Sequence, residues 1–168
     1  MGPKSDAPQS PQEYTTVDTR TPVYPQRMTM PNFAGKHGGA REMISLLVAD
    51  DEQMVREGLR MALALERDMS VVGEAANGQA ALDLATAMNP DVVIMDLAMP
   101  GMDGVAATAA LRVGALRCAV VILSIHNDLV SRERALAAGA VAYVDKGAGL
   151  ERLLEAIRSA ARSAPALA

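Results

Sequence analysis

Aromatic residues are scarce in this sequence: they make up 2% of its 168 positions, with no Trp, one Phe and three Tyr. Tyr143 is the only aromatic residue after position 40. A folded core in that part of the chain must therefore be built from Val, Ile, Leu, Met and Ala. Because 50% of the chain is hydrophobic, such a core is large enough for one ordinary domain.

The sequence also has few cysteines, no long apolar run and a small net charge, and each of these disfavours a class of protein. The single cysteine, Cys118, excludes an internal disulfide framework, suits a reducing cytosol, and is expected to be a small buried hydrophobe. No apolar run is long enough to cross a membrane, and the N-terminus lacks the apolar core of a signal peptide. The net charge of -4 argues weakly against a nucleic-acid or membrane surface. We therefore expect a cytoplasmic protein.

The first 42 residues differ in composition from the rest of the chain. They hold six of the nine prolines, mixed with Ser, Thr, Gln and Gly. No helical or alternating hydrophobic period runs through such a segment, so residues 1–42 are predicted to be a disordered N-terminal extension. One folded domain is predicted over residues 43–162, followed by a C-terminal tail over residues 163–168.

From Met43 onward, strand-like and helix-like segments alternate five times. Short apolar runs predict strands at Ile44–Ala49, Met69–Ala75, Val92–Asp96, Ala119–Ser124 and Val141–Val144. Apolar residues at helical spacing, with turn residues at the ends, predict helices at Glu52–Leu65, Gln79–Met88, Asp103–Val113, Leu129–Ala138 and Gly149–Arg162. This alternation predicts an α/β fold with a five-stranded, doubly wound parallel sheet in the common strand order 2-1-3-4-5.

The segment Val92–Gly104 has the pattern of a strand that leads into a functional loop. Its apolar run, typical of a parallel strand buried on both faces, ends at Asp96. Pro100 and Gly101 then require a tight loop before a helix can begin. A carboxylate at the end of a buried strand is costly to desolvate unless a cation lies beside it. Asp96 is therefore either a turn-initiating residue or, as its position favours, a nucleophile or metal ligand at the mouth of the sheet.

Chemically competent side chains also follow three other predicted strands: Asp50 and Asp51, then Ser124, then Lys146. In the order 2-1-3-4-5 the first and third strands are neighbours, which brings Asp50, Asp51 and Asp96 together. Three crowded carboxylates repel one another unless a cation lies among them, and Mg²⁺ suits a site with few protein ligands and retained waters. Lys146 and Ser124 on the other side would frame a site for an oxyanion such as a phosphoryl group.

These residues lie in motifs that resemble the receiver domain of two-component response regulators: Asp50-Asp51, Met95–Gly104, Leu123-Ser124 and Tyr143–Lys146. The likeness extends from about Met43 to Arg162. Details such as Val55–Leu59, Glu74–Gly78 and Leu123–His126 resemble the receivers of LuxR-type (NarL-like) transcription regulators. The resemblance implies a flavodoxin-like receiver fold over residues 43–162.

The resemblance also implies a phosphoacceptor site with a bound metal. Asp96 would be the phosphoacceptor, attacking a phosphohistidine on a partner sensor histidine kinase to form an acyl phosphate. Asp51 would ligate Mg²⁺ directly, together with Asp96 and the backbone carbonyl of Ala98. Asp50 would act largely through a bound water.

The resemblance implies further roles around the phosphoryl group. Lys146 would neutralise its oxygens, and Ser124 would bind one of them. Tyr143 would be an aromatic switch whose ring turns inward when Ser124 moves, or a tyrosine that merely packs. His126 would tune the access of water to the aspartyl phosphate, or be a solvent-facing loop histidine. Asp103 is expected to cap the third helix rather than to bind metal.

Two features depart from the family pattern. Many receivers have proline after this lysine, where the present chain has Gly147, so the isomer of the Lys146–Gly147 bond stays open. LuxR-type regulators continue into a helix-turn-helix output domain, and this sequence, which ends at Ala168, contains none.

The expected partners are a sensor histidine kinase and, through a helix face, a second copy of the chain. No membrane contact is expected. Arg152, Arg158 and Arg162 are interpreted as a solvated face rather than as a DNA surface. DNA would be a partner only through a helix-turn-helix that the given sequence lacks.

Two other functions are weaker on the residues. A Mg²⁺-dependent phosphatase or phosphotransferase of the haloacid-dehalogenase type would need a second acid two residues after Asp96, where this chain has Ala98. A flavodoxin would need a Ser-, Thr- or Gly-rich loop after the first strand, where this chain is acidic. We expect a phosphoacceptor signalling domain that is not a multi-turnover enzyme, with the aspartyl-phosphate phosphatase or phosphotransferase as the alternative.

Overall fold

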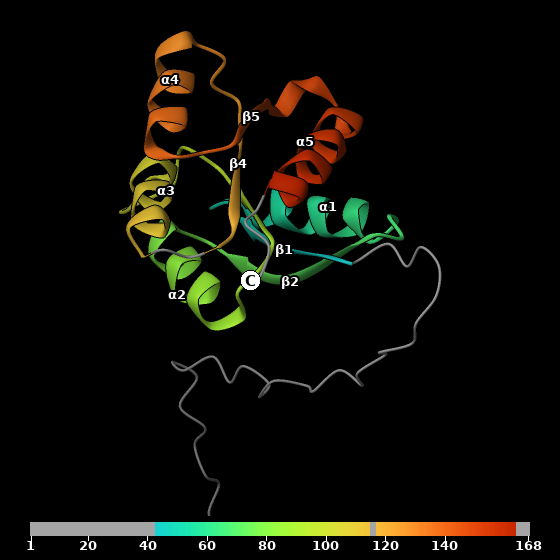
Figure 1. Ribbon diagram of the computed structural model, residues 1–168. Coiled ribbons are helices and arrows are strands. Elements are labelled where there is room, and N and C mark those ends of the chain that lie inside the picture. The colour runs from blue at the N-terminus through green and yellow to red at the C-terminus, as the bar shows by residue number, and fades with distance from the viewer. Residues whose placement is uncertain (1–42, 115–116, 164–168) are drawn as a thin grey trace, which may run out of the picture. The chain divides into compact units, whose positions relative to one another are not determined.

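Figure 1 presents a computed structural model of the protein, which describes residues 43–114 and 117–163. The extension predicted to be disordered, residues 1–42, lies outside the described residues, and so do residues 164–168 of the predicted tail. Within the described ranges, no helix is both long and apolar enough to cross a membrane.

The strands are β1 (Ile44–Ala49), β2 (Met69–Ala75), β3 (Val92–Met95), β4 (Ala119–Ser124) and β5 (Ala142–Asp145). They form one sheet in the order β2-β1-β3-β4-β5, and every neighbouring pair is parallel. The predicted α/β fold and strand order are therefore confirmed. Because all carboxyl ends of the strands meet at one edge, the loops that follow them share that edge.

The helices are α1 (Gln53–Leu63), α2 (Gly78–Met88), α3 (Gly104–Val113), α4 (Leu129–Ala138) and α5 (Leu150–Ser163), with a short 3-10 helix, η1 (Lys146–Ala148). Helices α1 and α5 cover one face of the sheet and α2, α3 and α4 cover the other (Figure 1). Each face has its own buried cluster of aliphatic residues and alanines. β1, β3 and β4 supply residues to both clusters, which is why their sequences are continuous apolar runs.

Side-chain caps fix where three of the helices begin. Asn77, Asp103 and Asp128 accept backbone hydrogen bonds from Ala80, Ala106 and Ser131 at 2.8, 2.7 and 2.8 Å. Each bond satisfies an amide that the first turn of a helix otherwise leaves unpaired. The prediction that Asp103 caps the third helix is therefore confirmed.

Several predicted boundaries of helices and strands differ from the structure by one or two residues. The first helix ends at Leu63 rather than Leu65, because the amides of Leu65 and Glu66 bond three residues back and tighten the chain into a turn. The last helix begins at Leu150 rather than Gly149, because Gly149 has a φ of 88° and lies outside helical conformation.

Candidate functional site

Three carboxylates meet where β1 and β3 end side by side. The last registered pair of these strands is Ala49 with Met95, and the amide of Asp96 donates to the Ala49 carbonyl at 2.8 Å. Asp50 and Asp96 therefore leave the sheet next to each other. With Asp51, they offer three carboxylate oxygens that lie within 4.8 Å of one another. The structure thus brings together the three acids that the strand order predicts to be neighbours.

The acids of this cluster differ in burial. Asp50 is 2% exposed and Asp96 is 5% exposed, whereas Asp51 is exposed to solvent. Burial raises the pKa of Asp96 above its ordinary value, and the nearby charge of Asp50 adds to the rise. Lys146 opposes that rise without cancelling it. The negative charge of Asp96 is therefore held at a cost that a cation would relieve.

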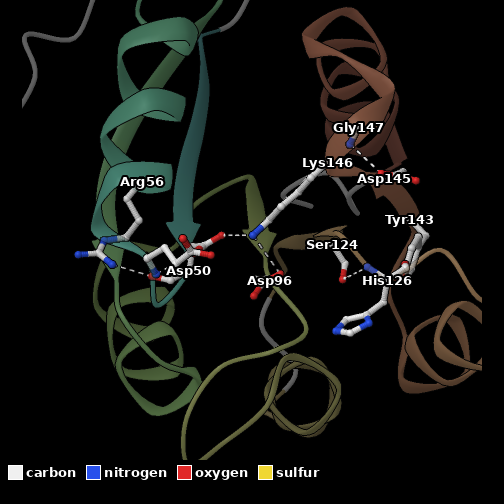
Figure 2. A network of polar contacts seen from close by, with 10 residues as sticks. Asp50, Arg56, Asp96, Ser124, His126, Tyr143, Asp145, Lys146 and Gly147 are labelled. Carbon is white, nitrogen blue, oxygen red and sulfur yellow. Dashed lines mark hydrogen bonds and ion pairs between the residues drawn. The ribbon is translucent and has the colours of Figure 1, made fainter.

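Lys146 lies between the two buried acids (Figure 2). Its Nζ is 2.7 Å from Asp50 Oδ2 and 3.3 Å from Asp96 Oδ1. Burial alone would lower the pKa of this amine, but the hydrogen bond to Asp50 and the charge of Asp96 raise it above its ordinary value. Lys146 is thus a fixed ammonium that links the tips of the first, third and fifth strands.

The donor set of this cluster fits a hard divalent cation. Three carboxylates face one ammonium, which leaves an excess of negative charge and only oxygen donors. Such a set, partly open to solvent at Asp51, suits Mg²⁺ with retained waters. Ala98, in the loop after β3, is exposed. Metal binding by its carbonyl and the water-mediated role of Asp50 stay predictions.

A tight loop holds Asp96 against the start of α3. The amide of Gly104 donates to the Leu97 carbonyl at 3.0 Å. A Cβ at Gly104 would lie 2.1 Å from the carbonyl oxygen of Asp96, so only glycine allows this approach. Gly101, with a φ of 75°, supplies the left-handed turn within the loop.

Ser124 and Tyr143 both hold the backbone of His126. Ser124 is fully buried at the end of β4, and its Oγ accepts a hydrogen bond from the His126 amide at 3.1 Å. The half-buried Tyr143 on β5 donates its hydroxyl proton to the His126 carbonyl. The His126 side chain is exposed and lines a polar hollow of about 190 Å³ together with Ala98 and Arg134. The backbone of one residue, His126, therefore connects the predicted phosphoryl-binding hydroxyl to the predicted aromatic switch.

The chain turns immediately after Lys146, and this turn orients its side chain. Asp145 Oδ1 accepts the amide of Gly147 at 2.7 Å and so begins η1, which the sequence analysis did not predict. The Lys146–Gly147 peptide bond, whose isomer the sequence left open, is trans.

Two arginines have contacts that the sequence analysis missed. Arg56 on α1 donates to backbone carbonyls of the acidic loop after β1. Arg158, which was expected to be part of a solvated face, instead pairs with Asp68 and Glu66 at 2.8 and 2.7 Å. No local sequence pattern marks either contact, because both partners lie on other segments that only the fold brings near.

Cys118, immediately before β4, is half-buried. Burial raises the pKa of its thiol, so a reactive thiolate is disfavoured, in agreement with its predicted hydrophobic role.

Known proteins resemble this chain over most of its length. A family model described as the response regulator receiver domain matches residues 46–158, more than half of the chain. Among curated proteins, the response regulator GacA of Pseudomonas aeruginosa is 41% identical over 116 residues, which cover 69% of this chain and 54% of GacA. The nitrate/nitrite response regulator protein NarL of Escherichia coli K12 is 36% identical over 121 residues, covering 72% of this chain and 56% of NarL.

Solved structures match over the same part of the chain. The signal receiver domain of the response regulator NarL from Mycobacterium tuberculosis has a TM-score of 0.70 and 37% identity, covering 73% of this chain and 98% of that one. A DNA-binding response regulator of the LuxR family from Staphylococcus aureus has a TM-score of 0.68 and 32% identity, covering 71% and 99%. This chain spans about half the length of the curated relatives it matches. It belongs to the response regulator receiver family of two-component systems, with NarL- and LuxR-type regulators among its relatives.

Proposed function

We propose that this chain accepts a phosphoryl group on Asp96 from a sensor histidine kinase, in a Mg²⁺-dependent reaction, and passes a conformational change to an output partner. The observation that carries the proposal is the position of Lys146 Nζ, 3.3 Å from Asp96 Oδ1 and 2.7 Å from Asp50 Oδ2, beside a third carboxylate. A receiver of two-component systems provides the chemical context, since its donor is a phosphohistidine.

The proposed transfer is a displacement at phosphorus. An Asp96 carboxylate oxygen attacks the phosphorus atom, the P–N bond to the kinase histidine breaks with its electron pair staying on nitrogen, and an acyl phosphate remains on Asp96. Asp51, Asp96 and the backbone carbonyl of Ala98 would hold Mg²⁺, with Asp50 acting largely through a bound water. When bound, the ion supplies positive charge to the phosphoryl oxygens. Lys146 supplies a second positive charge from the other side.

The proposed switch uses Ser124 and Tyr143. A phosphoryl oxygen offers the Ser124 hydroxyl a charged acceptor, which favours rotation of the side chain away from the His126 amide. Because Tyr143 binds the carbonyl of His126, a shift of the His126 backbone changes the support of the tyrosine on β5. The face formed by α4 and β5 would then present a different surface to its partner.

Regulation, rather than turnover, is the proposed outcome. The alternative, a phosphatase or phosphotransferase with an aspartyl nucleophile, lacks an acid at Ala98 to protonate a leaving group. We therefore propose a phosphoprotein that is phosphorylated and dephosphorylated once per cycle. A cytoplasmic location, a homodimer and control of transcription through a DNA-binding output are proposed from its relatives.

Intact-mass measurement after incubation with acetyl phosphate and Mg²⁺ tests this function. The parent chain is expected to gain the mass of one phosphoryl group, and Asp96→Asn is expected to gain none, because an amide cannot form the acyl phosphate. Asp83→Asn, which changes an exposed carboxylate on α2, is the matched control and should label like the parent. Equal labelling of Asp96→Asn, or sustained hydrolysis of phosphomonoesters that depends on Asp96, would contradict the proposal.

A further inference from the structure

Arg56, on the first turn of α1, reaches back to the backbone that carries the acidic cluster. Its Nη1 donates to the carbonyl oxygen of Asp50 at 2.7 Å and lies 3.3 Å from that of Asp51 (Figure 2). The contacts go to main-chain carbonyls, and the side chains of both acids are left for other partners. The Arg56 side chain is 15% exposed, so water has limited access to its guanidinium.

The guanidinium is also held from its other side. Glu74 on β2 lies 3.7 Å from Arg56 Nε and 3.2 Å from Arg60 Nε. Arg56 therefore connects three parts of the fold: α1, the strand β2 and the loop that follows β1. A second anchor fixes the same loop, because Asp50 Oδ1 accepts the amide of Glu52 at 2.9 Å. The path of the two acidic residues is thus set by Arg56 and by the Glu52 amide, neither of which belongs to the carboxylate cluster.

We propose that Arg56 is a positioning residue for the cation of this site: it fixes the Asp50–Asp51 backbone so that their carboxylates face one Mg²⁺. The inference rests on the proposed function, since it concerns the same metal. Groups that orient metal ligands without touching the metal strongly affect affinity, because a ligand that must be ordered on binding costs conformational entropy.

Charge and position make opposite predictions for Arg56. A positive charge near a cation site repels the incoming ion, so removing the guanidinium should strengthen Mg²⁺ binding if charge alone matters. If Arg56 acts by positioning, removing it should weaken Mg²⁺ binding. The sign of the change therefore distinguishes the two explanations.

Arg60 provides the matched control. It lies one helical turn after Arg56 on α1 and pairs with the same Glu74. The two arginines differ in that the carbonyls of Asp50 and Asp51 accept hydrogen bonds from Arg56. Arg56→Gln and Arg60→Gln each remove one positive charge from α1. Comparing them therefore isolates the effect of the hydrogen bonds from Arg56 to the loop after β1.

The experiment is a titration of the full chain with Mg²⁺ at fixed ionic strength and well below the melting temperature. Binding is monitored through the NMR signals of the backbone amides. Arg56→Gln is expected to raise the Mg²⁺ dissociation constant at least about threefold, below the roughly 10–100-fold typical of groups bonded directly to a metal ligand. Arg60→Gln is expected to bind as tightly as the parent or slightly tighter. Equal or tighter binding by Arg56→Gln, relative to Arg60→Gln, would overturn the inference.

Arg56→Lys keeps the test valid if Arg56→Gln fails to fold. A lysine retains the charge but replaces the planar fork with a single ammonium, so its affinity for Mg²⁺ should also fall. Parent-like affinity in Arg56→Lys would overturn the inference. The parent separates the two proposals: if it neither binds Mg²⁺ nor accepts a phosphoryl group, the proposed function fails and the inference with it. If the parent does both and the Arg56 variants bind like Arg60→Gln, the inference alone fails.

Discussion

At the scale of single residues, the buried charge of Asp96 costs the fold stability. Asp96 is 5% exposed, and it shares the Lys146 ammonium with Asp50. A raised pKa in the folded state means that the folded protein binds a proton more readily than the unfolded chain does. The fold therefore loses stability as pH rises from the ordinary Asp value of 3.8 through the raised value.

Asp96→Asn should accordingly stabilise the metal-free protein at neutral pH, where the cost of the buried charge is fully present. We expect a gain of about 1 kcal/mol, or about 4 °C in melting temperature for a domain of this size. The gain should shrink as pH falls towards the ordinary Asp pKa, because the parent carboxyl then becomes protonated. Thermal melts with a chelator at several pH values measure this, and a lower melting temperature for the variant at pH 7 would contradict it.

A second prediction concerns the backbone of His126, whose amide bonds to Ser124 and whose carbonyl bonds to Tyr143. Ser124→Ala and Tyr143→Phe should each cost about 1 kcal/mol of unfolding free energy, because each removes one hydrogen bond. Since both act on the backbone of one residue, their effects should couple by about 0.5 kcal/mol or more in a double-mutant cycle measured by urea unfolding.

The control pairs Tyr143→Phe with Ser163→Ala. The Ser163 hydroxyl bonds to the Ser159 carbonyl within α5 and shares no partner with Tyr143. This second pair should be additive. Equal coupling in both pairs would mean that the backbone of His126 does not connect Ser124 to Tyr143.

Sequence alone was informative about residues that end apolar strands. Asp50, Asp96, Ser124 and Lys146 stand out because a polar group there breaks a buried run, and parallel strands place such ends on one edge. Arg56 could not be found in this way. Its acceptors are main-chain carbonyls, which every residue has, and its distance from them depends on how α1 leaves the loop.

At the scale of elements, the start of α3 is limited by contact with the end of β3. Gly104→Ala would place a Cβ 2.1 Å from the Asp96 carbonyl oxygen and 3.0 Å from the Leu97 Cα. Backbone atoms cannot rotate aside as a side chain can, so either α3 or the Asp96 loop must shift. We expect a loss of at least about 2 kcal/mol in unfolding free energy, together with weaker phosphoryl labelling of Asp96.

Gly58→Ala is the matched control for this substitution. Gly58 lies inside α1, and a Cβ there would meet no atom within 4 Å. Alanine in a helix interior is favoured over glycine, so this change should stabilise the protein by about 0.5–1 kcal/mol. Chemical denaturation of both variants gives the comparison. A Gly104→Ala variant as stable as the parent would show that the loop after Asp96 adapts without strain.

Elements with strong local signals were predicted well, and those set by tertiary contacts were not. The caps Asp103 and Asp128 have a side chain that suits the role, so α3 and α4 begin close to where the sequence predicts. Leu65 continues the helical hydrophobic pattern, but it is 81% exposed and α1 has already ended. The short η1 follows from a bond between Asp145 and the Gly147 amide, which periodicity cannot indicate.

At the scale of the whole molecule, the described residues contain two complete cores, one on each face of the sheet. A chain that begins at Met43 should therefore melt within about 2 °C of the parent, because a segment with this Pro-rich composition is expected to bury little apolar surface. Calorimetry on both chains checks this. A clearly lower melting temperature for the shorter chain would mean that residues 1–42 contribute to the stability of the domain.

The strand order was predictable because a chain of alternating strands and helices has few right-handed, unknotted arrangements. The attachment of α5 was not predictable in the same detail. Arg158 bonds to Asp68 with Nε at 2.8 Å and Nη2 at 2.9 Å, joining the last helix to the segment before β2. Arginines on the surface of a helix look alike in sequence, and only the path of the chain decides which one finds a bidentate partner.

The position of Lys146 also affects how the protein can be handled chemically. It is the only lysine after position 42, its side chain is 17% exposed, and its raised pKa keeps the amine protonated. Succinimidyl esters acylate only the neutral amine, so dyes or resins that carry them should react with this lysine far more slowly than with an ordinary one. The receiver can thus be tethered to a sensor chip through its other amines while the contacts of Lys146 with Asp50 and Asp96 stay intact.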